Sequence, residues 1–226
     1  MSGKVYSGEK AVISLTSWKK RIDTVGLTLF SLLKQCPGFH IVLVLSEEEF
    51  PKKEAELPAS LMAFVNAKKI ELLWIYPNIR ALKKVLPTMA RYTNLPIISA
   101  DDDCVYNCNY ASELYDVYTC YKDAPITYNH VHNNPYVTEG PCTLYPPIIN
   151  HIFSEGIYKR LMSMVGYDNN DDGLFEYWLR TLGIQNRYAH DHEILPLRFH
   201  TTTGALNPSQ YGNPYYKQYF GENINQ

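Results

Sequence analysis

Four short apolar runs, separated by segments with helical patterning, dominate the first hundred residues. The runs cover residues 11–17, 40–45, 70–75 and 95–100, and none of them alternates strictly between apolar and polar positions. Strands of this kind are buried on both faces. Because a strand, a helix and a second strand fit within about 35 residues, the chain opens with a parallel, right-handed βαβ unit. The pattern predicts an α/β fold with a mostly parallel central sheet flanked by helices.

The signals for the other elements weaken along the chain. Pro87 should interrupt one helix, and Ser46, followed by three glutamates, resembles a helix start. Residues 129–147 are rich in Pro, Gly and Asn, and should form loops. The expected helices cover residues 25–35, 57–66, 81–92, 109–121, 154–165 and 174–181, and further strands are expected at residues 126–128 and 185–190.

The fourth apolar run leads directly into three carboxylates, Asp101, Asp102 and Asp103. In open α/β sheets, ligands bind outside the carboxyl ends of the strands. Mg²⁺ is usually held there by one or two carboxylates together with substrate phosphates, and Mn²⁺ has similar ligand preferences. The triplet therefore indicates a divalent metal site with a nucleotide diphosphate as the phosphate partner. The alternative is an acidic turn that caps the helix expected from residue 109.

Composition excludes several classes of protein. The formal net charge of −2 leaves no basic footprint for nucleic acid, so no nucleic-acid partner is expected. No run of eighteen apolar residues is present, which argues against a membrane span. The amino terminus lacks the apolar core of a signal peptide, and the five cysteines show no paired spacing for zinc. A cytoplasmic protein with reduced thiols is expected.

A second pair of carboxylates, Asp171 and Asp172, lies just before the helix expected from residue 174. A helix amino terminus favours the ionised form of a carboxyl group. A base that deprotonates an attacking hydroxyl must be a carboxylate separate from the metal site and supplied by a different loop. The alternative is that both residues only cap the helix.

The order and spacing of these segments resemble bacterial family-2-like glycosyltransferases with the GT-A fold. The resemblance extends over nearly the whole chain and implies one domain over residues 1–226. The nucleotide-binding half would cover about 10–105 and a loop-rich acceptor-binding half about 106–226. The matching segments are ISLTSWKKRI at 13–22, TLFSLLKQ at 28–35, VLSEEEFP at 44–51, NIRALKKVLP at 78–87, DDD at 101–103, LYPP at 144–147, DDGLF at 171–175 and GALN at 204–207, followed by Asn213.

The resemblance assigns roles to individual residues. The DxD motif of the family corresponds to Asp101 and Asp103, which would bind the metal, and Asp101 and Asp102 would also contact the donor. His200 is the first choice for a third metal ligand, with His190 and His192 as alternatives, although a single histidine is often only structural. The remaining donor-binding residues would be Thr16, Ser17, Arg21, Asn78, Lys83 and Lys84. For either lysine alone, a solvated helix face is the alternative.

The implied activity is the metal-dependent transfer of a hexose from a nucleotide-diphosphate sugar, with a UDP-sugar favoured and Mn²⁺ or Mg²⁺ as cofactor. The acceptor would be a hydroxyl of a glycan, a lipid-linked sugar or a surface polysaccharide, which is compatible with peripheral membrane contact. The reaction would be a single, inverting displacement with Asp172 as base, paired with Asp171.

Two other classes of protein are considered. A non-catalytic nucleotide-sugar or carbohydrate-binding module would keep the fold, but it would not need two separate carboxylate pairs. A P-loop phosphoryl-transfer enzyme would need GxxxxGK[ST] after the first strand, and the sequence lacks it. Aspartyl-phosphate phosphatases resemble the chain only in having a DxD, which in that family follows the first strand.

Overall fold

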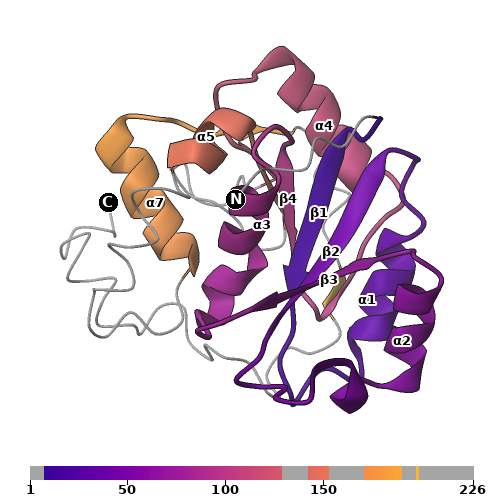
Figure 1. The fold of residues 1–226 in the computed structure, drawn as a ribbon. Helices are drawn as coiled ribbons and strands as arrows, with labels where there is room; N and C mark the ends of the chain where they lie inside the picture. The colour runs from indigo at the N-terminus through magenta and orange to yellow at the C-terminus, as the bar shows by residue number, and fades with distance from the viewer. Residues whose placement is uncertain (1–7, 129–141, 153–170, 190–196, 199–226) are drawn as a thin grey trace.

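The structure is a computed structural model that describes residues 8–128, 142–152, 171–189 and 197–198. Within these residues the fold is built on one seven-stranded sheet and a separate two-stranded sheet (Figure 1). In the small sheet, β5 (Cys104–Val105) pairs with β9 (Leu197–Arg198). The spatial order of the large sheet is β3 (Glu71–Ile75), β2 (Phe39–Ser46), β1 (Ala11–Thr16), β4 (Ile97–Ala100), β7 (Thr143–Tyr145), β6 (Ile126–Thr127) and β8 (Arg187–Tyr188).

The predicted mostly parallel α/β sheet is confirmed. Strands β3, β2, β1 and β4 are parallel to one another, and β6 is parallel to β8. Strand β7 is antiparallel to both β4 and β6. All four strands predicted in the first hundred residues are present, because short apolar runs rich in β-branched residues and bounded by turn signals favour strands over helices.

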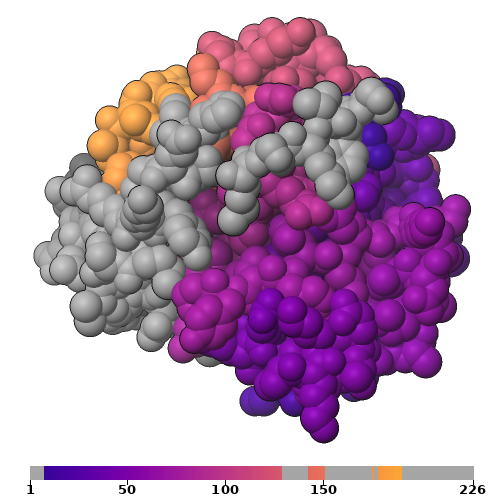
Figure 2. Space-filling view, viewed as in Figure 1, coloured from indigo at the N-terminus to yellow at the C-terminus, as the bar shows by residue number. Residues whose placement is uncertain are grey.

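Helices cover both faces of the sheet, as residue alternation along β1 requires. Ile13 and Leu15 lie in one buried cluster, and Val12 lies in the other. The first cluster includes residues of α1 (Val25–Leu32), α2 (Ala59–Asn66) and α4 (Tyr110–Cys120). The second includes residues of α3 (Leu86–Arg91), α5 (Pro147–Ile152) and α7 (Asp171–Leu182). The space-filling view shows α7 and α4 at the upper left and top of the molecule (Figure 2).

Two prolines explain where the observed helices are interrupted or absent. The helix predicted over residues 81–92 is interrupted as expected, into a 3₁₀ helix η2 (Arg80–Lys84) and α3, with Pro87 in the first turn of α3. The helix start predicted at Ser46 is wrong. The Ser46 hydroxyl accepts a hydrogen bond from the Glu48 N–H, but only a turn follows, and then a 3₁₀ helix η1 (Lys53–Glu56). Pro51 disfavours helical backbone at the preceding residue.

The later part of the chain contains elements that the sequence did not indicate. Strand β7 lies within a stretch predicted as loop, and its three residues are too few to show a period. Helix α7 begins at Asp171, three residues before the predicted start. The helix predicted over residues 154–165 lies outside the described residues. None of the helices among the described residues is both long and apolar enough to cross a membrane.

Candidate active site

The candidate site lies at the carboxyl ends of β1 and β4. These strands are neighbours, yet the chain leaves β1 for β2 on one side and reaches β4, on the other side, only after β3. Such a reversal of strand order is a topological switch point, where open α/β sheets bind their ligands. The loop after β1 contributes Ser17 and Arg21, and the acidic triplet 101–103 follows β4.

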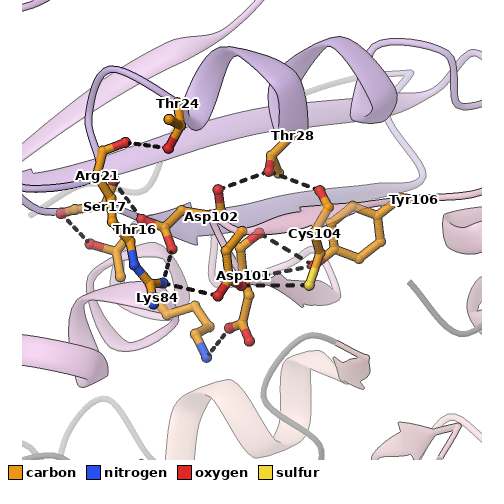
Figure 3. Close-up of polar contacts among 11 residues, drawn as sticks. Thr16, Ser17, Arg21, Thr24, Thr28, Lys84, Asp101, Asp102, Cys104 and Tyr106 are labelled. Carbon is orange, nitrogen blue, oxygen red and sulfur yellow. Dashed lines mark hydrogen bonds and ion pairs between the residues drawn. The ribbon is translucent and has the colours of Figure 1, made fainter. Parts of the chain in front are cut away.

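The middle aspartate, Asp102, joins the two loops. The Ser17 hydroxyl donates a hydrogen bond to Asp102 Oδ2 at 2.6 Å, and Arg21 Nη1 lies 2.9 Å from Oδ1 of the same side chain (Figure 3). Arg21 Nη1 also lies 3.1 Å from Asp103 Oδ2. Asp102 is buried, and this burial raises its pKa, although the Ser17 and Arg21 contacts oppose the rise. The predicted donor-binding residues Ser17, Arg21 and Asp102 are therefore brought together.

The carboxylates of Asp101 and Asp103 lie close enough together to be candidate metal ligands. One oxygen of each and the Cys104 Sγ all lie within 4.8 Å of one another. Two carboxylates at this spacing fit Mg²⁺ or Mn²⁺, which need few protein ligands when substrate phosphates complete the coordination. The Cys104 thiol is a softer donor that suits these ions less well. The side chain of Asp101 is 17% exposed, against 8% for Asp102 and 2% for Asp103.

Both predicted lysines are buried rather than on a solvated helix face, so that alternative is wrong. Lys84 Nζ lies 2.7 Å from Asp101 Oδ1, and a cation therefore already faces the acidic triplet. Lys83 forms an ion pair with Glu49, and burial lowers the pKa of Lys83 despite this partner. Lys84 thus lies at the candidate metal site, whereas Lys83 links η2 to the segment after β2.

Thr16 and Asn78 lie at the same edge of the sheet. Thr16 ends β1, and its hydroxyl donates a hydrogen bond to the Val44 carbonyl at 2.8 Å. Asn78 follows β3, and its side-chain oxygen accepts a hydrogen bond from the Arg80 N–H at 3.0 Å. Both side chains are therefore held by hydrogen bonds to the backbone at the carboxyl ends of parallel strands.

Three residues that the sequence analysis missed hold the acidic loop. Thr28 Oγ1 lies 2.9 Å from the Asp102 carbonyl and 2.8 Å from the Cys104 carbonyl. The Ser31 hydroxyl accepts the Tyr106 N–H, and the Tyr106 hydroxyl accepts the Asp101 N–H. The available signal was the polar pair Thr28 and Ser31 on the otherwise apolar, buried face of α1. Its partners are more than seventy residues away, and spacing alone does not identify them.

The second carboxylate pair opens helix α7. Asp171 and Asp172 lie in its first turn, rather than just before it as predicted. The helix is anchored by Phe175, whose ring centroid lies 5.1 Å from that of Tyr145 in β7, the strand paired with β4. Figure 1 shows α7 on the same side of the sheet as α3 and α5, with which it shares a buried cluster.

The predicted third metal ligand, His200, lies outside the described residues, as do the alternatives His190 and His192. Arg198, two positions before His200 in the chain, is described and pairs with Cys104 in the small sheet. Strand β9 therefore lies beside Cys104, the residue that follows the acidic triplet.

Comparison with known proteins identifies the fold. No protein-family model and no curated protein sequence matches the chain. Among solved structures, a mannosyltransferase from Pyrobaculum calidifontis in complex with GDP-Man and Mn²⁺ matches with a TM-score of 0.56 at 8% identity. TarS residues 1–349 from S. aureus match with a TM-score of 0.53 at 11% identity. The matches cover 79% and 80% of this chain, but only 54% and 58% of those structures. The chain shares the fold of these two structures and spans little more than half of their length.

Proposed function

We propose that this chain is a metal-dependent glycosyltransferase that takes a hexose from a nucleotide-diphosphate sugar. One observation carries the proposal: Asp101 and Asp103 present two carboxylates at metal-binding spacing, at the switch point of a glycosyltransferase fold. The fold alone leaves the chemistry open. The residues of the site point to the chemistry. Two carboxylates at the switch point of the sheet can bind a cation whose other ligands are the oxygens of a diphosphate.

The donor would bind against residues 10–105. Asp101 and Asp103 would hold Mn²⁺ or Mg²⁺, and His200 is proposed as a third ligand. When bound, this cation neutralises the negative charge that accumulates on the departing nucleoside diphosphate. Lys84, which already lies within 2.7 Å of Asp101, would contribute a second positive charge beside the phosphates. The nucleoside would lie against Thr16, Ser17, Arg21, Asn78 and Asp102, with Lys83 holding η2 in place.

The acceptor would bind against residues 106–226. Asp172 is proposed as the base that removes a proton from the attacking hydroxyl, with Asp171 beside it in the chain. The first turn of a helix keeps such a carboxylate ionised and ready to accept a proton. The reaction would be a single displacement with inversion, in which the base and the leaving group would lie on opposite faces of the sugar. A glycan, a lipid-linked sugar or a surface polysaccharide would provide the hydroxyl.

A donor panel tests this proposal. The full chain is incubated with UDP- and GDP-sugars and either Mn²⁺ or Mg²⁺, and release of nucleoside diphosphate is followed. We expect slow hydrolysis of one donor, a UDP-hexose, that stops with EDTA and in an Asp101→Asn/Asp103→Asn variant. Metal-dependent binding without any turnover, even with candidate acceptors, would support the non-catalytic binding module. Turnover that is insensitive to EDTA would contradict the metal assignment.

A further inference from the structure

The hydroxyl of Tyr106 holds the main chain of Asp101 from both sides. The Asp101 N–H donates a hydrogen bond to Tyr106 Oη at 2.7 Å, and the Tyr106 hydroxyl donates to the Asp101 carbonyl at 3.4 Å (Figure 3). Two peptide groups that flank one Cα are thereby tied to a single atom. The direction in which the Asp101 side chain leaves the backbone is set by these two peptide groups.

Tyr106 is itself firmly held. It is 5% exposed, its ring centroid lies 4.4 Å from that of Tyr110, and its N–H donates to the Ser31 hydroxyl at 3.0 Å. Burial raises its pKa well above the usual value of a tyrosine, so the hydroxyl stays neutral and serves as both donor and acceptor. The hydroxyl therefore keeps its proton at neutral pH, and its two hydrogen bonds to Asp101 do not depend on pH there.

The acidic loop needs such an anchor because its carboxylates repel one another. One carboxylate oxygen of Asp101 and one of Asp103 lie within 4.8 Å of each other. When no metal is bound, the two negative charges repel and favour conformations in which the carboxylates are farther apart. Groups that orient metal ligands from behind typically change metal affinity by about 10–100-fold when they are removed. Thr28 holds the Asp102 and Cys104 carbonyls, Lys84 contacts the Asp101 carboxylate, and Tyr106 holds the two peptide groups of Asp101.

We propose that Tyr106 is a positioning residue that sets the Asp101 carboxylate for metal binding through the two hydrogen bonds of its hydroxyl. This inference rests on the proposed function, since it assumes that Asp101 and Asp103 bind a divalent cation. Tyr106 would not touch the metal, the donor or the acceptor.

The test compares Tyr106→Phe with Tyr110→Phe in the full chain. Tyr110 is a matched control: it is equally buried in the same aromatic cluster, and its hydroxyl donates to the carbonyl of Ser99, two residues before the triplet. Free Mn²⁺ is titrated by electron paramagnetic resonance without donor. We expect Tyr106→Phe to weaken Mn²⁺ binding about tenfold, and Tyr110→Phe to change it less than twofold, with both variants folded by circular dichroism.

A second measurement needs no variant. If the Tyr106 hydroxyl holds Asp101, the Asp101 amide of the metal-free wild type exchanges with solvent as slowly as the amides of β4, by nuclear magnetic resonance. Rapid exchange would overturn the inference. So would equal Mn²⁺ affinity in Tyr106→Phe and wild type, and in both cases the proposed function would stand. A wild type that neither binds Mn²⁺ nor turns over any donor would overturn the proposed function, and this inference with it.

Discussion

At the scale of single residues, the acidic triplet depends on the cations that face it. Arg21 Nη1 lies within about 3 Å of both Asp102 and Asp103, and Lys84 lies 2.7 Å from Asp101. Buried carboxylates remain charged only when such partners compensate for the lost hydration. Removing one partner leaves an uncompensated charge, which costs more than the pair itself contributes. Arg21 is therefore expected to stabilise the folded chain through Asp102 and Asp103.

Arg21→Gln should lower the free energy of unfolding by about 3 kcal/mol, as expected when a buried pair loses one partner. The matched control is Lys19→Gln, because Lys19 forms an exposed ion pair with Glu56 at 2.9 Å. That exposed pair should contribute far less to stability than the buried Arg21 contacts. Urea denaturation measures both variants. Equal losses in the two variants would show that the Arg21 contacts are no more important than a surface pair.

Substitutions in the two carboxylate pairs should have different effects on donor binding and on sugar transfer. Asp103→Ala removes a proposed metal ligand, so metal-dependent donor binding should be lost. Asp172→Asn removes only the proposed base, so donor binding should remain within about twofold while transfer falls by about 10²-fold or more. Isothermal titration with a UDP-sugar and Mn²⁺ measures the binding, and product formation measures the transfer. Transfer at the wild-type rate in Asp172→Asn would make the base assignment wrong.

Glu71 offers a pH-dependent test far from the acidic loop, at the amino end of β3. Burial alone would raise its pKa, but hydrogen bonds from His40 and Tyr92 and the charge of Arg91 lower it to about 2. A depressed folded-state pKa stabilises the protein above the unfolded value near 4.5, and this contribution is lost as pH falls from there towards 2.

Thermal unfolding of wild type and Glu71→Gln should therefore differ most near pH 7, with the variant less stable. The difference should shrink steadily between about pH 5 and pH 2, as the wild-type carboxylate takes up its proton. A difference in melting temperature that is constant across this range would show that the ionised form of Glu71 is not the stabilising one.

At the scale of elements, the Ser14 hydroxyl links β1 to the segment that carries Lys84. The Ser14 hydroxyl donates to the Lys84 carbonyl at 2.5 Å and lies 2.6 Å from Thr88 Oγ1. Ser14 is fully buried, and both partners belong to the η2–α3 region. The position of Lys84 beside the acidic triplet is thus set partly by a residue in the middle of the neighbouring strand.

Ser14→Ala should lower the free energy of unfolding by about 1–3 kcal/mol, because buried polar groups lose a hydrogen-bond partner. Ser112→Ala is the control, since the Ser112 hydroxyl makes a solvent-exposed bond to the Asn109 carbonyl. That change should stay within about 0.5 kcal/mol. Guanidinium denaturation of the two variants measures the difference. A loss in Ser14→Ala no greater than in Ser112→Ala would contradict the proposed link.

The elements differ in how well the sequence predicts them. Strands β1 to β4 could be predicted because most of their residues are apolar, and the break before α3 because Pro87 marks it. Strands β5, β7 and β9 are two or three residues long, so they carry no usable period. Their existence depends on pairing with distant segments, which propensity does not encode.

The residues of the candidate site also differ in how well the sequence predicts their positions. Asp101 and Asp103 were predictable because a carboxylate cluster follows a buried strand. The hydrogen bonds of Thr28 and Tyr106 were not, because they join residues that come together only in the folded chain. The burial of Lys83 and Lys84 was not predictable either, since η2 packs against β1 and β2 through its lysine-bearing turn.

At the scale of the whole molecule, the account depends on where a metal and a diphosphate bind. The direct measurement is a crystal structure of the full chain with UDP and Mn²⁺, with data collected at the manganese absorption edge. We predict one anomalous peak between the carboxylates of Asp101 and Asp103, with the diphosphate on the side of Lys84. A manganese peak elsewhere, or UDP bound away from the carboxyl ends of β1 and β4, would contradict the account.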